Sequence, residues 1–162
     1  GLTSDQNVAF SEELGYYDRV VPYSEVEGVA NELSAYIDIA GDVDVRSRLH
    51  HSLQDNAAQT LLVGATHWDQ FGQSVGGGPL PGSEPQVFFA PAQIEKRDGD
   101  WGRGVMMGKA YAASIELVTQ LAPTLLMESH SGAEACDAIW QSLLRNQISG
   151  QRGVMVSLQA EA

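Results

Sequence analysis

Residues 35–65 read AYIDIAGDVDVRSRLHHSLQDNAAQTLLVGA and carry the clearest repeating pattern in the chain. Residues 35–40 predict a strand that is closed by a Gly-Asp pair, and residues 43–53 predict a helix. Residues 60–65 are apolar through their middle, as expected for a strand that is covered on both faces. A strand, a helix and a second strand in this order predict a parallel βαβ unit.

The flanking sequence alternates in the same way. We expect further strands at residues 1–3, 19–22, 86–90, 124–127 and 153–158, and further helices at residues 5–14, 25–33, 91–97, 104–121 and 133–144. Residues 66–86 are rich in glycine and proline and predict a long loop. The fold class is therefore predicted to be α/β, with a mostly parallel sheet flanked by helices.

Composition limits the classes of function. The 162 residues have the length of one domain, with 43% hydrophobic and 19% charged residues, as in a globular protein. The net charge of −12 disfavours nucleic acid and anionic membranes as partners, since both attract clustered Lys and Arg. The single cysteine, Cys136, excludes an intrachain disulfide and a thiolate metal cage, so we expect a reducing cytoplasm. Because the first residue is Gly1 rather than Met, we expect a piece of a longer chain.

Several short motifs resemble a known family. TSDQNVAF at residues 3–10, ELG at 13–15 and DRVVPY at 18–23 resemble a stretch of the medium-chain dehydrogenase/reductases, above all of their zinc-free quinone-oxidoreductase branch. YIDIAG at 36–41, LLVGAT at 61–66 and ISGQRGV at 148–154 resemble later strands and turns of that family. A closer likeness is to the DUF2855 family, through GLTS at 1–4, VGATHWD at 63–69, PLPG at 79–82 and FFAPAQ at 88–93.

The resemblance implies a Rossmann-like domain that is incomplete. Residues 1–162 would form the C-terminal part of a nucleotide-binding domain, and residues 124–162 would include elements that return to a catalytic domain outside this chain. The first strand and its Gly-rich phosphate-binding loop would precede Gly1. In the strand order 3-2-1-4-5-6, this loss separates the third strand from the fourth.

The resemblance also implies a dinucleotide site along the carboxyl ends of the strands. The expected cofactor-binding residues are Thr3, Ser4, Asn7, Tyr23, Ala40, Gly41, Gly64, Ala65, Thr66, Phe89, Ala90 and Arg152. Hydroxyl and amide groups at Thr3, Ser4 and Asn7 favour NADP, because they can donate to a 2′-phosphate; NAD is the alternative. Four of these residues also have an ordinary structural interpretation. Ser4 could be a helix N-cap, Asn7 and Arg152 could be solvated side chains, and Tyr23 could contribute to packing.

Three further residues are candidates for contact with a substrate. His67 and Trp68 begin the long loop, and His67 could donate a proton or simply bond the backbone. Lys96 could neutralise an enolate or a phosphate, or lie at a solvated helix end. His50 and His51 are adjacent and would point about 100° apart on a helix, so no metal site is predicted.

The function expected from the resemblance is hydride transfer to or from a carbonyl or an activated alkene, by a zinc-independent oxidoreductase. Its partners would be a dinucleotide and a small-molecule substrate, with a homodimer as a further expectation. No catalytic residue is assigned. The alternatives are a non-catalytic nucleotide-binding or interaction module of the same fold, and a truncated fragment without activity.

Overall fold

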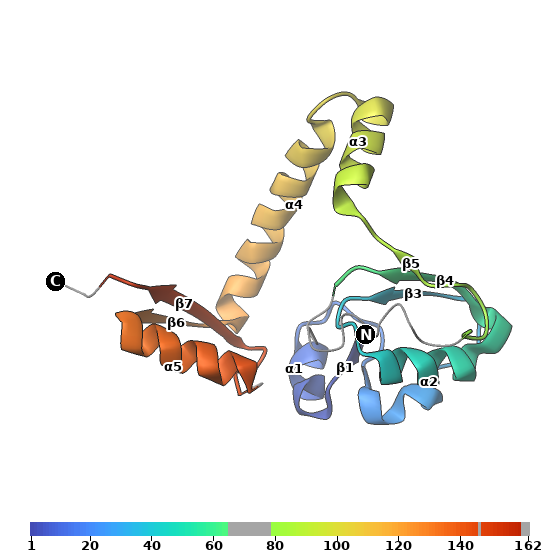
Figure 1. Ribbon diagram of the computed structural model, residues 1–162, viewed down its shortest axis with the longest axis horizontal. Coiled ribbons are helices and arrows are strands. Elements are labelled where there is room, and N and C mark those ends of the chain that lie inside the picture. The colour runs from blue at the N-terminus through green and yellow to red at the C-terminus, as the bar shows by residue number, and fades with distance from the viewer. Residues whose placement is uncertain (65–78, 146, 160–162) are drawn as a thin grey trace.

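The computed structural model describes residues 1–64, 79–145 and 147–159 as an α/β protein, which confirms the predicted fold class (Figure 1). Every strand pair in this part of the chain is parallel. In order along the chain the elements are β1 (Leu2–Thr3), η1 (Asp5–Asn7), α1 (Val8–Glu13), β2 (Val21–Pro22), η2 (Tyr23–Gly28), β3 (Ser34–Asp38), α2 (Val43–Leu53), η3 (Gln54–Asn56), β4 (Ala57–Leu62), β5 (Gln86–Val87), α3 (Ala90–Trp101), α4 (Val105–Leu121), η5 (Ala122–Thr124), β6 (Leu126–Ser131), α5 (Ala133–Leu144) and β7 (Arg152–Ser157).

The strands form three small sheets instead of one. Their orders are β1-β2, β3-β4-β5 and β6-β7. The strands predicted as the third and fourth of the parent sheet are β2 and β3, and they lie in different sheets, as the incomplete strand order predicted. The arrangement of the described strands and helices is consistent with a Rossmann-like fold.

The core lies between α2 and the sheet β3-β4-β5. Its buried members are Val26, Val45, Leu49, Leu53 and Ala57, against which Leu2, Tyr23, Val29 and Tyr36 pack. The opposite face of the same sheet is bare, since Ile37, Ile39 and Val87 are 58%, 64% and 68% exposed. Burial of apolar surface therefore stabilises one face of this sheet only.

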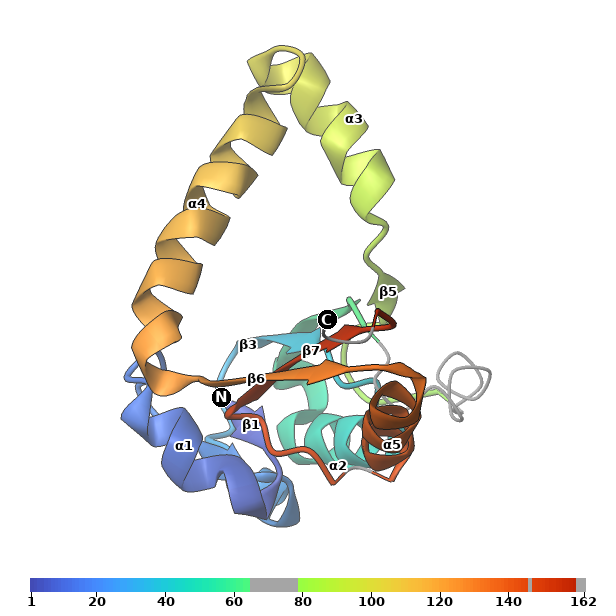
Figure 2. The ribbon, with the colours of Figure 1, turned by 90° about the vertical axis from the view of Figure 1, so that its left-hand side faces the viewer.

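A long helical arm follows β5. Helices α3 and α4 pack on each other and project away from the sheets, and the chain returns through α4 to β6 (Figures 1 and 2). At the tip, the Arg97 guanidinium and the Lys109 ammonium lie 5.0 and 5.4 Å from the centre of the Trp101 ring. Within the described residues, no helix has the length and apolar character needed to cross a bilayer.

Most element predictions were close. Helices α2 and α5 have the predicted bounds, whereas α3 is longer than predicted and β6 begins two residues later. The helix predicted at residues 25–33 is wrong in its second half, because η2 ends at Gly28, Val29 is extended, and the residues from Ala30 to Leu33 are not helical. The weak apolar spacing there reflects Val26 and Val29 packing on the core from a short 3-10 helix.

A buried histidine fixes the connection between α2 and β4. The ring of His50 is fully buried, with Nδ1 2.8 Å from the Pro81 carbonyl oxygen and Nε2 2.9 Å from Thr60 Oγ1. Because a carbonyl only accepts, Nδ1 carries the proton and Nε2 accepts from the Thr60 hydroxyl. This arrangement satisfies the histidine that sequence analysis left without a role.

We predict that Thr60→Val lowers the free energy of unfolding by about 1–3 kcal/mol, because it leaves buried Nε2 without its donor. Thr60→Ser, which keeps the hydroxyl, should cost less. Urea unfolding followed by circular dichroism measures both variants. Equal losses for the valine and the serine variants would show that the hydrogen bond does not contribute.

Candidate functional site

The carboxyl ends of three parallel strands lie at one edge of a sheet. Asp38 of β3 pairs with Leu62 of β4, and Leu62 pairs with Val87 of β5, so the chain leaves all three strands at the same level. The predicted site residues that follow these strand ends are Ala40, Gly41, Gly64, Phe89 and Ala90. We call this row of turns the carboxyl edge.

The ends of β1 and β2 approach the same edge. Thr3 pairs with Pro22, so Ser4 and Tyr23 follow their strands side by side. Burial raises the pKa of Tyr23, and the nearby carboxylates of Asp42 and Asp38 raise it further. Those carboxylates belong to the end of β3 and to the turn after it. Tyr23, which follows β2, therefore lies near the turn that follows β3.

The turn after β3 is held by a buried carboxylate. Asp38 Oδ1 accepts a hydrogen bond of 2.7 Å from the Gly41 N–H, and Oδ2 accepts one of 2.8 Å from Arg46 Nη1 on α2. The side chains of Asp38 and Arg46 are 1% and 3% exposed. Asp42 then caps α2 by accepting the Val45 N–H at 3.0 Å. The turn is thus fixed before any ligand binds.

Glycine at position 64 is required by the way β3 and β4 meet. The N–H groups of Val63 and Gly64 both donate to the Asp38 carbonyl. A Cβ added to Gly64 would lie 2.5 Å from the carbonyl oxygen of Ile39, which is closer than atoms approach without movement. The small residue therefore permits close contact between two strand ends at the carboxyl edge.

A hydrogen bond between Asp5 and Ser24 connects the residues after β1 to those after β2. Ser4 stands at the N-cap position of η1, but its hydroxyl caps no helix amide, so the interpretation of Ser4 as a side-chain cap is wrong. Asp5 instead accepts a hydrogen bond of 2.5 Å from the Ser24 hydroxyl. The Asn7 amide lies beside Gly150, since a Cβ placed there would be 3.9 Å from it.

Two predicted residues lie on other elements. Arg152 begins β7 and donates two hydrogen bonds, of 2.7 and 2.6 Å, to the carboxylate of Glu128 on β6. Those bonds lower the pKa of Glu128 to about 2. Lys96 is exposed on α3 of the arm. The Arg152 guanidinium is therefore engaged by Glu128, and Lys96 lies on the helical arm.

Four predicted residues cannot be placed against this edge. Ala65, Thr66, His67 and Trp68 lie outside the described residues. Among the residues that are described, no group of three or more His, Cys, Asp or Glu side chains could hold a metal ion.

Sequence analysis missed the residues that shape the edge, which are Tyr36, Asp38 and Arg46. Burial raises the pKa of Tyr36, and the carboxylate of Asp38 raises it further, because Tyr36 and Asp38 share the covered face of β3. One signal could have found them. An aspartate within the apolar run AYIDIA, followed eight residues later by an arginine on the next helix, indicates a buried ion pair.

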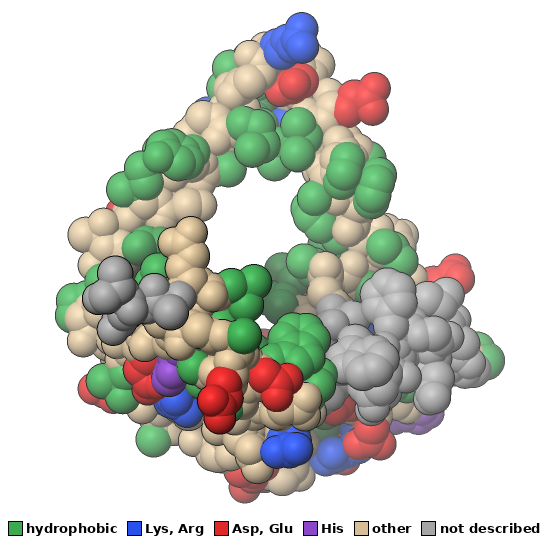
Figure 3. Space-filling model, turned by 60° about the vertical axis from the view of Figure 1, so that its left-hand side comes forward, with side chains coloured by type: hydrophobic (Ala, Val, Ile, Leu, Met, Phe, Trp, Pro, Cys, Tyr) green, Lys and Arg blue, Asp and Glu red, His purple; other side chains and the backbone are tan. Residues whose placement is uncertain are grey.

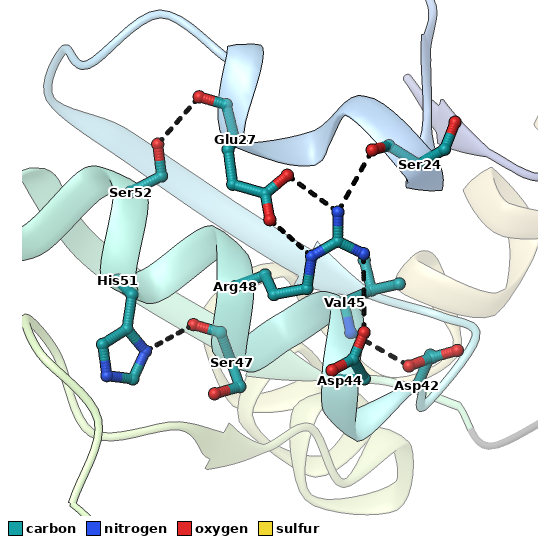
Figure 4. A network of polar contacts seen from close by, with 9 residues as sticks. All are labelled: Ser24, Glu27, Asp42, Asp44, Val45, Ser47, Arg48, His51 and Ser52. Atoms are coloured by element: carbon teal, nitrogen blue, oxygen red, sulfur yellow. Dashed lines mark hydrogen bonds and ion pairs between the residues drawn. The ribbon is translucent and has the colours of Figure 1, made fainter.

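A second charge network ties η2 to α2 (Figure 4). Arg48 donates bonds of 2.5 and 2.7 Å to the two carboxylate oxygens of Glu27, and a bond of 3.2 Å to the Ser24 carbonyl. The bonds from Arg48 lower the pKa of Glu27 to about 2. Arg46 and Arg48 are therefore both engaged with carboxylates, and an anionic ligand at this edge would depend on neutral donors.

We predict that Gly64→Ala lowers the free energy of unfolding by about 1–3 kcal/mol, because the new methyl group meets the Ile39 carbonyl. Gly28→Ala is the matched control, since a Cβ at Gly28 meets nothing within 4 Å. It should be neutral, or stabilising by less than about 1 kcal/mol. Thermal unfolding compares the two variants, and equal behaviour would contradict the role of Gly64.

Comparison with known proteins assigns a family. The family model described as "Protein of unknown function (DUF2855)" matches residues 1–149. No curated protein and no solved structure matches the chain. Because the matched region includes every element of the carboxyl edge, the site described above is a feature of the matched domain. The chain belongs to the DUF2855 family.

Proposed function

We propose that this chain supplies the cofactor-binding part of a zinc-independent, NADP-dependent oxidoreductase that is related to the medium-chain dehydrogenase/reductases. The observation that supports this proposal is the carboxyl edge, where the parallel strands β3, β4 and β5 end at the same level around small residues, with Tyr23 near the carboxylates of Asp38 and Asp42. In open α/β sheets, ligands bind outside the carboxyl ends of the strands, and residues without bulky side chains admit a dinucleotide close to the backbone.

Each part of the edge would have its own task. The turns at Ala40–Gly41 and Gly64 would carry the middle of the dinucleotide, held in place by the Asp38 carboxylate behind them. Phe89 is 63% exposed and would cover the reactive ring. The nicotinamide supplies the hydride chemistry, with a carbonyl or an activated alkene as the substrate. The reducing cytoplasm is the compartment that this proposal assumes.

The preference for NADP rests on the end of β1. The hydroxyls of Thr3 and Ser4 and the amide of Asn7 would donate to a 2′-phosphate, and the Ser4 hydroxyl caps no helix amide. The carboxylate of Asp5 is the unfavourable neighbour, although it is turned toward Ser24. Recognition by neutral donors would make binding modest, because hydrogen bonds from charged groups are roughly twice as strong.

The full natural protein that carries these residues should oxidise NADPH in the presence of a quinone or an enone. Absorbance at 340 nm across a panel of both substrate classes measures the reaction, with NADH as the comparison cofactor. Binding of NADPH without turnover over the whole panel would favour a non-catalytic nucleotide-binding module of the same fold. Absence of binding to NADPH and NADH would overturn the proposed function.

We predict that Asp5→Asn tightens NADPH binding about fivefold, because it removes a negative charge near the 2′-phosphate worth about 1 kcal/mol. NADH binding should not improve, since NADH carries no such phosphate. Glu13→Gln is the matched control, because it removes an exposed carboxylate from the far end of α1. Isothermal titration measures all three proteins. An equal gain for NADH would contradict the assignment of this residue.

A further inference from the structure

A hollow lies at the amino ends of β3, β4 and β5, at the opposite end of this sheet from the carboxyl edge. Its lining includes Ser34, the first residue of β3, Ala58, the second of β4, and Gln86, the first of β5. The volume of the hollow is about 520 Å³, which lies within the range of small-molecule sites. None of its lining residues belongs to the carboxyl edge.

Three of the lining residues share one face of the sheet. Ala35 pairs with Gln59, and Leu61, which is two residues further along β4, pairs with Gln86. Because alternate residues of a strand share a face, Ala35, Gln59 and Gln86 lie on the same side. Thr60 points to the other side, where its hydroxyl contacts α2. The floor of the hollow is therefore part of the bare face of the sheet.

One wall of the hollow is fixed against the start of β4. The Ser83 N–H donates a hydrogen bond of 2.8 Å to the Ala57 carbonyl, and the Pro81 carbonyl accepts from the buried ring of His50. Between them, Gly82 has a φ of +79°, and a Cβ there would lie 2.8 Å from the Ala57 carbonyl oxygen. Glycine permits this close approach. The wall that contains Ser83 is thus in place before any ligand binds.

The hydroxyl of Ser83 is unsatisfied. Its oxygen is shielded from solvent and has no hydrogen-bond partner in the described part of the chain, where no other buried side-chain nitrogen or oxygen is left in this state. Buried hydroxyls nearly always have a partner, because an unpaired polar group in the interior is costly. Since Ser83 lines the hollow, rotation about its Cα–Cβ bond can bring the hydroxyl to a ligand there.

The chemistry of the lining favours a cation with an apolar stem. Glu84 is the one charged residue among the described lining residues, so an anion would meet a carboxylate that no Lys or Arg of the lining offsets. The side chains of Gln59 and Gln86 provide carbonyl oxygens, which accept hydrogen bonds from an ammonium group. Ala35 and Ala58 add apolar surface on which methylene groups can pack.

We propose that this hollow binds a short aliphatic amine, at a site separate from the carboxyl edge. The ammonium group donates hydrogen bonds to the Glu84 carboxylate and to the Ser83 hydroxyl oxygen, and the methylene chain lies along Ala35 and Ala58. An aliphatic ammonium stays protonated at pH 7, as a lysine side chain does. The proposal does not depend on the oxidoreductase function, because the cofactor would lie at the other end of the strands.

Three compounds with the same four-carbon chain test the choice of ligand class. Isothermal titration of the full natural protein, without NADPH, compares 1,4-diaminobutane with 1,4-butanediol and succinate. We expect the diamine to bind at least about fivefold more tightly than the diol, because only the diamine gains the attraction of the carboxylate. Succinate should bind least. Absence of diamine binding would overturn the proposal, as would equal or tighter binding of the diol or of succinate.

A pair of charge-removing variants locates the binding. Glu84→Gln should weaken diamine binding about fivefold, since it keeps the shape of the side chain and removes its charge. Glu95→Gln is the matched control, because it removes an exposed carboxylate from α3 of the arm and should leave binding unchanged. Equal losses for the two variants would show a diffuse attraction of amines to this acidic protein, and would overturn the site.

Ser83→Ala separates a ligand contact from a packing role. It removes a hydroxyl that has no described partner, so the melting temperature without ligand should stay the same or rise by a few degrees. Diamine binding should weaken about threefold. Unchanged diamine binding would overturn the assignment of Ser83 to the site, whatever the melting temperature. All these measurements are made without NADPH, so their failure is distinguishable from a failure of the proposed function.

Discussion

The carboxylate of Asp38 is the constraint on which the arrangement of the N-terminal half depends. It receives the Gly41 N–H and the Arg46 guanidinium at once, so it fixes the end of β3, the turn and the first part of α2 relative to one another. A buried charge is costly unless its partners are well placed. Its two partners, Gly41 and Arg46, lie on the turn and on α2. The need to pair the buried carboxylate with both therefore fixes how α2 packs against the sheet.

The packing of α2 against the sheet explains which face of β3-β4-β5 is buried. Helix α2 and η2 enclose the core on one face of β3-β4-β5, whereas the other face carries exposed isoleucine and valine side chains. In the space-filling view, hydrophobic side chains also gather around an opening between the helical arm and the sheets (Figure 3). Exposed apolar surface on this scale marks interaction sites in soluble proteins. The described elements thus leave one face of this sheet available for a further layer or partner.

The sequence was informative wherever local pattern determines structure. The apolar spacing of α2 and α5, and the apolar run of β4, need only neighbouring residues, and their types were predicted correctly. The separation of β2 from β3 followed from the resemblance alone. The Asp38–Arg46 pair and the His50–Thr60 bond were not predicted, because each joins a strand to a helix and depends on the angle between them. The Arg152–Glu128 pair was not predicted either, since it joins two neighbouring strands that are far apart in the sequence.

Hydrogen bonds within the protein hold the turns of the carboxyl edge in place. The turns at Gly41 and Gly64 are fixed by hydrogen bonds from their own backbone N–H groups to Asp38 at the end of β3. The guanidinium groups of Arg46 and Arg48 are held by carboxylates of β3 and η2, so both charges serve to attach α2 to its neighbours.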